Sequence, residues 1–415
     1  MNKIFIYTEG ACWKRLLDAD KIRKYLLANG YNVVQDSNEA DKIVLVTCAF
    51  LNGKSENSIN RVKEFQKINA ELIVGGCLPA VEKEKLSEIF DGKTIETKNL
   101  DTDIERIFPP TKIKFADIQD ANMLFEEATG DTFFILIKRI LRKSKFIAKT
   151  LSKTQEYVVK HLLGEKSTAY KFVNKQFHIR IAWGCTGNCS YCTIRKSTGL
   201  FRSKPFEECM KEFNQGLKEG YRNFILDATD VGSYGIDIYS SFPKLLDEMT
   251  KSPENFYITI REINAKWVAR YANELEELIK RNKIIILDVA IQSVNNRILS
   301  LMKRPQDKDK LKEAFKKIRK ANQDFSLTCE FIIGFPTETE EEFLENLEFI
   351  KYVEFNGGQL YEFSCRTGTE AEKIEPRISN EEIIRRIKYA KKYLKSLGYY
   401  ATYIPKEHIL LFMKK

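Results

Sequence analysis

Three cysteines stand close together near the middle of the chain, where Cys185, Cys189 and Cys192 have the spacing CxxxCxxC. Three thiolates on one such loop can hold a single iron–sulfur cluster and leave its fourth iron without a protein ligand. A zinc site would need a fourth ligand, and the next cysteine, Cys209, falls within an expected helix. The spacing favours a cluster with one open iron. A zinc site or three unrelated core cysteines are the alternatives.

Three further cysteines are spread over the first eighty residues. Cys12, Cys48 and Cys77 each follow a short apolar segment that we interpret as a β-strand. The carboxyl ends of strands in an open α/β sheet meet at one edge, where such proteins bind ligands, so these thiols could converge there. They would then hold a second cluster. The alternative is that they are small buried residues near strand ends, a common role for cysteine.

The elements that must place this second group alternate between strands and helices. Strands are expected at Lys3–Tyr7, Lys42–Thr47 and Leu72–Val74, and helices at Asp18–Asn29, Lys54–Ile68 and Val81–Ile89. This order predicts a small parallel sheet covered by helices, which we assign to an N-terminal domain at residues 1–110.

Strands and helices also alternate around and after the central cysteine loop. The expected strands are His178–Trp183, Asn223–Ala228, Phe256–Arg261, Ile284–Ile291, Ser326–Ile333 and Gly358–Ser364. Six such units predict a partial, open form of the βα barrel over residues 177–375, with functional side chains at the carboxyl ends of the strands. The polar residues at these ends that we expect to face a cofactor or substrate are Asp227, Asp230, Arg261, Gln292 and Glu330. Residues 376–415 are assigned to a C-terminal helix and a short tail.

A basic segment lies in the linker that we assign to residues 111–176. Between Phe133 and Lys160, apolar residues recur among eight lysines and arginines, and Glu156 is the single acidic residue. This pattern predicts a basic amphipathic helix or helix pair. It could bind RNA phosphates, lie on an anionic membrane surface, or turn a basic face to water.

The composition limits the class of protein. A net charge of +10 favours a polyanionic partner such as RNA, with a solvated basic surface as the alternative. No apolar stretch is long enough for a transmembrane segment, and no signal peptide is recognisable, so a cytoplasmic location is expected. In that reducing compartment, the nine cysteines are expected to be metal ligands or core residues rather than disulfides.

The central loop carries a family resemblance. CxxxCxxC with an aromatic residue, Tyr191, just before the last cysteine is similar to the signature of radical S-adenosylmethionine (SAM) enzymes. The resemblance implies that Cys185, Cys189 and Cys192 hold a [4Fe-4S] cluster whose open iron binds SAM. Cleavage of SAM then yields a 5′-deoxyadenosyl radical that abstracts hydrogen from an unactivated C–H bond. It also implies a barrel core, with Tyr191 and the strand-end residues near SAM.

Other segments resemble the methylthiotransferase family within that superfamily. They are Val46–Cys48 with Glu56-Asn57, Gly76-Cys77, Leu226–Gly235, Gln292-Ser293 with Leu299–Arg304, Gly334–Thr339 and Ser364–Thr369. The first cysteine motif departs from the family, because Ala11 replaces the usual glycine and Arg15 stands where an asparagine is usual. The 46 residues after Thr369 are not expected to form the C-terminal TRAM domain of family members that act on tRNA or ribosomal protein.

The second resemblance implies a cofactor set and several possible functions. It implies two [4Fe-4S] clusters, with Cys12, Cys48 and Cys77 holding the auxiliary one, two equivalents of SAM per turnover, and an electron donor such as flavodoxin or ferredoxin. The expected reaction is methylthio insertion into a tRNA adenosine next to the anticodon, which the positive charge favours. The alternative substrate is a side chain of a ribosomally made peptide or a ribosomal protein, which the missing TRAM domain and the divergent motif favour. Two other hypotheses are a radical SAM enzyme whose N-terminal cluster is an electron relay, and a non-catalytic iron–sulfur protein.

Overall fold

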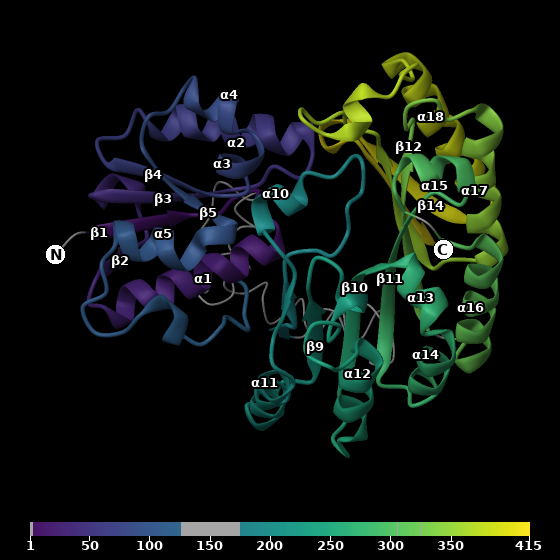
Figure 1. Cartoon of the computed structure of the whole chain (residues 1–415), viewed down its shortest axis with the longest axis horizontal. Coiled ribbons are helices and arrows are strands. Elements are labelled where there is room, and N and C mark those ends of the chain that lie inside the picture. Colours follow the sequence, from purple (N-terminus) through teal and green to yellow (C-terminus); the bar gives the residue numbers. More distant parts are fainter. Residues whose placement is uncertain (1–2, 126–174, 305, 324) are drawn as a thin grey trace, which may run out of the picture. The chain divides into compact units, whose positions relative to one another are not determined.

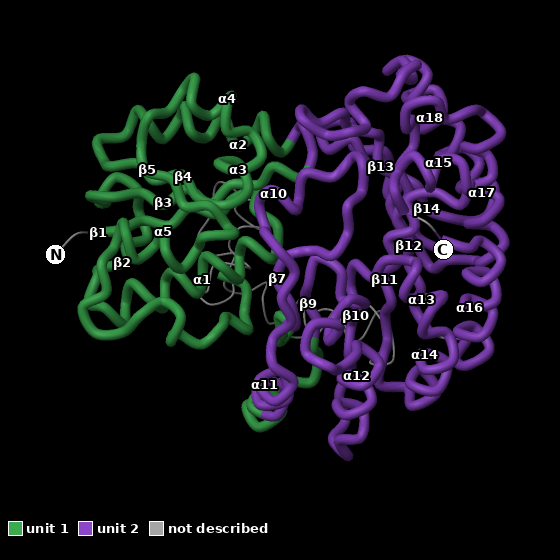
Figure 2. Tube along the Cα trace, viewed as in Figure 1, with its two compact units in different colours: residues 1–50, 54–180, 215–224 green, residues 51–53, 181–214, 225–415 purple. Residues whose placement is uncertain are grey.

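The computed structural model describes residues 3–125, 175–304, 306–323 and 325–415 (Figure 1). The chain divides into two compact units, which comprise residues 1–50, 54–180 and 215–224, and residues 51–53, 181–214 and 225–415 (Figure 2). The basic segment 133–160 lies outside the described residues.

A parallel sheet forms the centre of the first unit. Within the described residues its strand order is β2-β1-β3-β4-β5, and every neighbouring pair is parallel. The strands are β1 (Lys3–Tyr7), β2 (Asn32–Val34), β3 (Lys42–Thr47), β4 (Glu71–Gly76) and β5 (Lys93–Glu96). The helices are α1 (Trp13–Ala28), α2 (Asn52–Phe65), α3 (Leu78–Val81), α4 (Lys83–Ser87) and α5 (Leu100–Ile107), with 3-10 turns η1 (Ser37–Glu39), η2 (Thr97–Asn99) and η3 (Phe115–Asp117). The expected small parallel sheet is confirmed.

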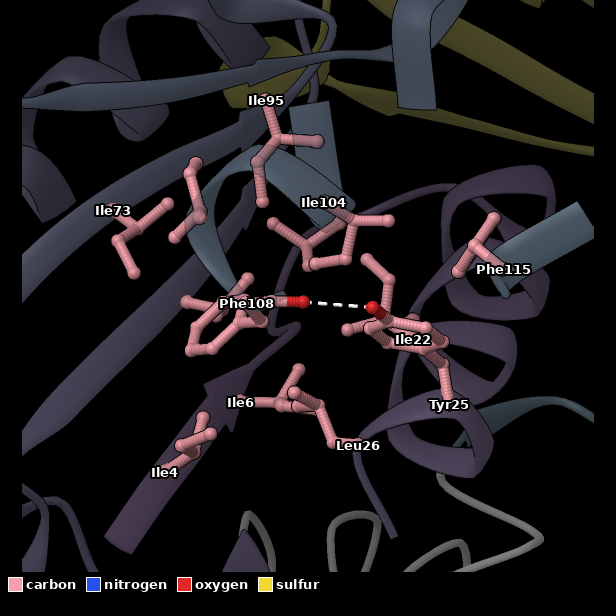
Figure 3. Packing of buried hydrophobic residues seen from close by; sticks show 14 residues of the cluster. Ile4, Ile6, Ile22, Tyr25, Leu26, Ile73, Ile95, Ile104, Phe108 and Phe115 are labelled. Carbon is pink, nitrogen blue, oxygen red and sulfur yellow. Dashed lines mark hydrogen bonds between the residues drawn. The ribbon is translucent and has the colours of Figure 1, made fainter. Parts of the chain in front are cut away.

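Both faces of this sheet are buried. Along β3, Ile43 and Leu45 belong to one hydrophobic core and Val44 and Val46 to another, as the alternation of side chains in a strand requires. Figure 3 shows the second of these cores, where the Tyr25 hydroxyl donates to the Phe108 carbonyl oxygen at 2.7 Å. Burial on both faces explains the uninterrupted apolar run that identified β3 in the sequence.

Several elements of the first unit differ from the sequence-based expectation. Helix α1 begins at Trp13 rather than at Asp18, so that Cys12 is its N-cap residue. The helix expected at Val81–Ile89 is the pair α3 and α4, which are separated at Glu82, where φ is −122° and ψ is 44°. Strands β2 and β5 and helix α5 were not expected. The strands are short and only partly buried, so they lack a strong apolar pattern.

A larger sheet organises the second unit. Among the described strands its order is β14-β15-β13-β12-β11-β10-β9-β6. Strands β10 to β13 pair in parallel, and β15 is antiparallel to β13 and to β14. The strands are β6 (Gln176–Arg180), β9 (Asn223–Asp227), β10 (Tyr257–Asn264), β11 (Ile284–Gln292), β12 (Ser326–Ile333), β13 (Gly357–Glu362), β14 (Tyr399–Ile404) and β15 (Ile409–Lys414). Strand β6 and the five strands β9 to β13 correspond to the six expected ones, and the tail adds an antiparallel hairpin beside β13.

Helices connect the strands of the larger sheet in the order expected of a partial βα barrel. They are α11 (Phe206–Lys218), α12 (Phe242–Lys251), α13 (Ala265–Arg270), α14 (Ala272–Ile279), α15 (Asn296–Leu301), α16 (Lys308–Ala321), α17 (Glu340–Val353) and α18 (Asn380–Ser396). The smaller elements are strands β7 (Ala182–Trp183) and β8 (Arg202–Ser203), helix α10 (Ile194–Thr198), and 3-10 turns η4 (Val231–Ser233), η5 (Glu370–Lys373) and η6 (Pro405–Glu407). No described helix combines the length and the apolar character needed to cross a bilayer.

Candidate functional site

The loop with Cys185, Cys189 and Cys192 lies between β7 and α10 and is fixed by its Ser190. The Ser190 backbone N–H donates to the Met302 carbonyl oxygen at 3.1 Å, and its hydroxyl donates to the Leu301 carbonyl oxygen at 2.6 Å. The Ser190 carbonyl oxygen accepts the N–H of Ala371 at 2.9 Å. The cysteine loop is therefore attached to the end of α15 and to η5.

Each of the three sulfurs in this loop accepts a hydrogen bond. The N–H of Gly187 lies 3.2 Å from Cys185 Sγ, and the N–H of Ile194 lies 3.4 Å from Cys192 Sγ. Arg304 Nη1 lies 3.7 Å from Cys189 Sγ. Hydrogen bonds to ligand sulfurs are among the features that set the potential of an iron–sulfur cluster. The three cysteines and their donors therefore suit such a cluster.

Two of the sulfurs face the same small space. A Cβ atom added to Gly187 would lie 3.3 Å from Cys185 Sγ and 3.6 Å from Cys189 Sγ. Burial raises the pKa of Cys192 to about 12, and the nearby sulfurs of the other two cysteines act in the same direction. Burial also raises the pKa of Cys185. These thiols need a cation to become thiolates, and a metal centre supplies one.

Tyr191 contributes packing beside the cysteines. Its ring lies against the apolar cluster that includes Met302 and Phe335, with 6.4 Å between the centroids of the Tyr191 and Phe335 rings. Burial raises the pKa of Tyr191, and the Cys189 and Cys192 sulfurs raise it further. The hydroxyl therefore stays protonated next to the sulfurs.

The structure places the two predicted aspartates at the end of β9. The carbonyl oxygen of Asp227 accepts the N–H of Ile181 at 2.9 Å, and the residue is buried. Asp230 has both carboxylate oxygens engaged, by the N–H of Asn264 at 3.1 Å and by Trp267 Nε1 at 2.8 Å. Burial raises the pKa of Asp230. These bonds give Asp230 a structural function in joining η4 to β10.

The other three predicted strand-end residues lie on β10, β11 and β12. Gln292 ends β11 at a register shift, with a φ of 71°, which is strained for a residue other than glycine. Its buried amide oxygen Oε1 has no hydrogen-bond partner among the described residues. The Tyr361 hydroxyl donates to Gln359 Oε1 at 2.6 Å and lies 3.5 Å from a carboxylate oxygen of Glu330. Arg261 is partly exposed on β10. Of these, Gln292 shows the clearest polar group available to a ligand.

Arg304 is a functional candidate that the sequence interpretation did not single out. Besides Cys189, it donates to the carbonyl oxygen of Ala290 through Nη2 at 2.5 Å, and so links the cysteine loop to β11. The signal in the sequence is that Arg304 is the last residue of the family-like segment after Gln292. The motif alone does not reveal contact with a sulfur.

In the first unit, Cys12, Cys48 and Cys77 follow β1, β3 and β4. In the register of β3 and β4, Thr47 pairs with Gly76, so Cys48 and Cys77 leave the sheet from adjacent positions. The N–H of Cys77 also donates to the Thr47 carbonyl oxygen at 3.2 Å. The strand order of the sheet thus brings the second cysteine group to one edge.

The charges around this second group favour a thiolate. Cys48 donates a hydrogen bond to the Cys12 sulfur, which lowers the pKa of Cys12, with Arg15 and Lys14 adding to the effect against the cost of burial. The donor, Cys48, has its pKa raised by the same bond and by burial. Cys12 also occupies the N-cap position of α1, without a side-chain hydrogen bond to the helix, and the partial positive charge at a helix N-terminus favours a thiolate. Thiolate ligands of this kind suit the positively charged iron–sulfide core of a cluster.

Among the described residues, no three Cys, His, Asp or Glu side chains lie close enough to enclose a single metal ion. A [4Fe-4S] cluster is larger than one ion, and its three thiolates bind three different irons. The ligands of a cluster are therefore spaced more widely than those of one ion.

Comparison with known proteins covers both units. Residues 179–350 match the radical SAM superfamily, and residues 3–95 match the uncharacterized protein family UPF0004. The two matches include both cysteine groups. The N-terminal match therefore extends the similarity beyond the barrel shared by radical SAM enzymes.

Relatives with two different named substrates resemble nearly the whole chain. The ribosomal protein uS12 methylthiotransferase RimO of Thermoanaerobacter sp. (strain X514) is 28% identical over 96% of this chain and 84% of its own length. The probable threonylcarbamoyladenosine tRNA methylthiotransferase of Methanocaldococcus jannaschii is 26% identical over 95% of this chain and 85% of its own length. A solved structure of the radical SAM methyltransferase TsrM from Kitasatospora setae covers 89% of this chain and 73% of its own, with a TM-score of 0.58 and 11% identity. That last similarity shows the fold alone.

Proposed function

The chain belongs to the radical SAM methylthiotransferase family, and we propose that it inserts a methylthio group into an unactivated C–H bond of a macromolecule. The observation that carries this proposal is the presence of two groups of three cysteines in one chain, one after three neighbouring strands of the parallel sheet and the other on a single loop between β7 and α10. When bound, the clusters and SAM supply the radical chemistry, the sulfur and the methyl group. One SAM per turnover serves as the methyl donor and a second as the radical source.

In the second unit, we assign Cys185, Cys189 and Cys192 to the [4Fe-4S] cluster that binds SAM. The N–H groups of Gly187 and Ile194 and the guanidinium of Arg304 donate to the three sulfurs and stabilise their negative charge. Tyr191 and the apolar cluster behind it exclude water from one side. These residues orient and shield the centre.

We assign the predicted strand-end residues to the binding of SAM and substrate. Gln292 offers its amide oxygen for a hydrogen-bond donor of the ligand. Asp227, Arg261 and Glu330 are proposed to contact the same ligands from the neighbouring strands. Asp230 is proposed to act by positioning, because Asn264 and Trp267 occupy its oxygens.

In the first unit, Cys12, Cys48 and Cys77 are assigned to a second [4Fe-4S] cluster. Their placement after three neighbouring strands of one parallel sheet supports this assignment. The lowered pKa of Cys12 provides one thiolate before any metal binds. Since three thiolates leave one iron open, this centre has a free position for sulfur.

The substrate proposed first is a tRNA adenosine next to the anticodon. A net charge of +10 favours binding to a polyanion, and one group of relatives is named for a tRNA substrate. Binding to RNA phosphates weakens steeply with salt, so the affinity for tRNA is expected to fall strongly between low and physiological ionic strength.

The second candidate substrate is a protein side chain. On one face of the larger sheet, Asp288 accepts the Thr328 hydroxyl at 2.6 Å, and a carboxylate oxygen of Glu330 lies 3.5 Å from the Tyr361 hydroxyl. Burial, and then the charges of Glu330, Asp288 and Glu262, raise the pKa of Tyr361. This acidic face attracts a cationic group, either of SAM itself or of a basic protein segment, and repels a phosphate backbone. Relatives named for ribosomal protein uS12 agree with this candidate.

The clusters also require a reducing environment and an electron source. All nine cysteines are free thiols, which fits a cytoplasmic location. A flavodoxin or ferredoxin is the proposed electron donor.

The proposal is tested by anaerobic reconstitution with iron and sulfide, followed by mass spectrometry of products from SAM, dithionite and methanethiolate. tRNA and a ribosomal protein fraction are offered in parallel reactions. The wild-type chain should bind about eight irons, four per cluster. Replacing Cys12, Cys48 and Cys77 by alanine should halve the iron and abolish methylthio transfer but preserve 5′-deoxyadenosine formation.

The matched control is Cys365→Ala, which removes a partly exposed cysteine outside both groups. It should keep the iron content and the product. If the triple N-terminal variant still modifies substrate without adding sulfur, the N-terminal centre is an electron relay. If the fully loaded wild type cannot cleave SAM, the chain is a non-catalytic iron–sulfur protein.

A further inference from the structure

Arg15 is a buried cation in the first turn of α1. Its side chain is 6% exposed and its Nη1 lies 3.1 Å from Asp18 Oδ2. Nη1 also donates to the Thr97 hydroxyl. Its Nε has no hydrogen-bond partner among the described residues. The guanidinium is thus held in place by one carboxylate and one hydroxyl.

The position of Arg15 relates it to all three cysteines of the first unit. It follows Cys12 by one helical turn, and its N–H donates to the Cys12 carbonyl oxygen at 2.8 Å. Arg15 also lines a small cavity together with Val46 and Gly76, which precede Cys48 and Cys77 at the ends of β3 and β4. Burial alone would lower the pKa of Arg15, but the attraction of Asp18 and of the three sulfurs outweighs it and raises the pKa.

The local charges leave one positive charge in excess. Asp18 is shared by two guanidinium groups, since Arg180 Nη1 lies 2.6 Å from Asp18 Oδ1. All three side chains are at most 11% exposed. A buried charge without a counter-charge is costly, so this excess positive charge favours anions nearby, of which the Cys12 thiolate is one. A [4Fe-4S] core with three thiolates is anionic overall and gains one more negative charge on reduction.

We propose that Arg15 is a positioning residue that stabilises the more negative states of the cluster held by Cys12, Cys48 and Cys77. The negative charge arrives either as an electron or as an anionic sulfur ligand at the open iron. Arg15 therefore raises the reduction potential of this cluster and increases the affinity of its open iron for sulfide. The inference rests on the proposed function, which places a cluster at these cysteines.

The test uses the full chain with Cys185, Cys189 and Cys192 replaced by alanine, so that only the N-terminal cluster gives a signal. The midpoint potential is measured by a redox titration followed by electron paramagnetic resonance. Arg15→Gln should shift the reduction equilibrium at least tenfold toward the oxidised form, which is about 59 mV for one electron. Sulfide should half-saturate its spectral change at a concentration at least tenfold higher. Arg15→Lys should stay within threefold of the parent in both measurements.

Arg180→Gln is the matched control. This variant removes one of the two arginines that pair with Asp18 and leaves the Arg15–Asp18 pair. In the Arg15→Gln variant, the Arg180–Asp18 pair remains instead. The control should shift the equilibrium less than threefold. Equal shifts in Arg15→Gln and Arg180→Gln, or no shift in either, would overturn the assignment of the effect to Arg15.

Loading of the cluster separates this inference from the proposed function. If the parent chain binds no cluster, the proposed function fails. If the parent binds about four irons and Arg15→Gln leaves the potential unchanged, only the inference fails. Arg15→Asn, which restores the residue usual in the family, is a second neutral variant. If both neutral variants fail to load and Arg15→Lys loads, the charge is needed to hold the cluster, which supports the inference. Failure of all three variants to load would overturn it in favour of a packing role.

Discussion

Replacing Gly76 by alanine should damage the N-terminal centre without affecting the other one. Gly76 has a φ of +95°, and a Cβ there would lie 2.8 Å from the Thr47 nitrogen and closer still to the Thr47 carbonyl oxygen. These are backbone atoms of the paired strand β3, so no side-chain rotation can relieve the clash. The two strands must separate where they deliver Cys48 and Cys77.

Two effects contribute to the free-energy cost of Gly76→Ala. A residue other than glycine at such a φ costs about 1–3 kcal/mol. Separation also lengthens the hydrogen bond from the Cys77 N–H to the Thr47 carbonyl oxygen, now 3.2 Å, which costs about 1 kcal/mol. We expect a total of about 2–4 kcal/mol, localised at the ends of β3 and β4.

The neighbouring Gly75 provides a matched control. A Cβ on Gly75 would lie 3.6 Å from Ile95 Cβ and 3.8 Å from the carbonyl oxygens of Ile95 and Leu45, which are ordinary contacts. Gly75→Ala should therefore change the local stability by at most about 1 kcal/mol. Both variants differ from the wild type by one methyl group next to the same cysteine.

Two measurements distinguish Gly76→Ala from Gly75→Ala. Native-state hydrogen exchange of the β3 and β4 amides gives the free energy of local opening, and iron analysis after reconstitution gives the number of clusters. In Gly76→Ala, the β3 and β4 amides should exchange faster, and the protein should bind about four irons instead of about eight. The variant should form 5′-deoxyadenosine but no methylthio product. Gly75→Ala should resemble the wild type. Wild-type exchange and full iron in Gly76→Ala would refute the reasoning.

Three further outcomes are expected. Arg304→Gln removes the cation beside the central cysteine loop, so reduction of that cluster should become less favourable by about 1–2 kcal/mol, as measured by redox titration of a chain lacking the N-terminal group. In the metal-free protein at pH 6, iodoacetamide should alkylate Cys12, whose pKa is lowered by its hydrogen bond with Cys48, faster than Cys192, whose pKa burial raises to about 12, because alkylation requires the thiolate; equal rates or faster alkylation of Cys192, measured by mass spectrometry of peptides, would contradict this expectation. Lys204→Met takes the cation from the buried carboxylate of Glu212, 2.6 Å away, and should lower the free energy of unfolding by about 3–5 kcal/mol in urea, whereas adding Glu212→Leu should recover most of the loss.

Local sequence was sufficient for the features that depend on short segments. Cys185, Cys189 and Cys192 lie within eight residues, so any compact loop brings their sulfurs together. The strands β3 and β12 were predicted at their observed bounds because both are continuous apolar or alternating runs. The partly buried β2 and β5 carry too few apolar residues to be recognised in this way.

Some details of the candidate site required contacts between distant segments. Nothing near Arg304 in the sequence indicates that its guanidinium reaches Cys189, 115 residues earlier. Asp230 was expected to face a ligand because it follows a strand. Its oxygens instead bond to Asn264 and Trp267, which belong to another part of the chain.

The sequence by itself determined which residue types are available for chemistry: two sets of three thiols, each after an apolar strand, with the spacing and motifs of one enzyme family. Only the tertiary structure decided how those groups affect each other. The register of β3 and β4 makes Cys48 and Cys77 neighbours, and the packing of α1 buries Arg15 beside them. The physical reason is that hydrophobic patterning is local along the chain, whereas pairing register, burial of charge and hydrogen bonding between side chains depend on which segments meet in space.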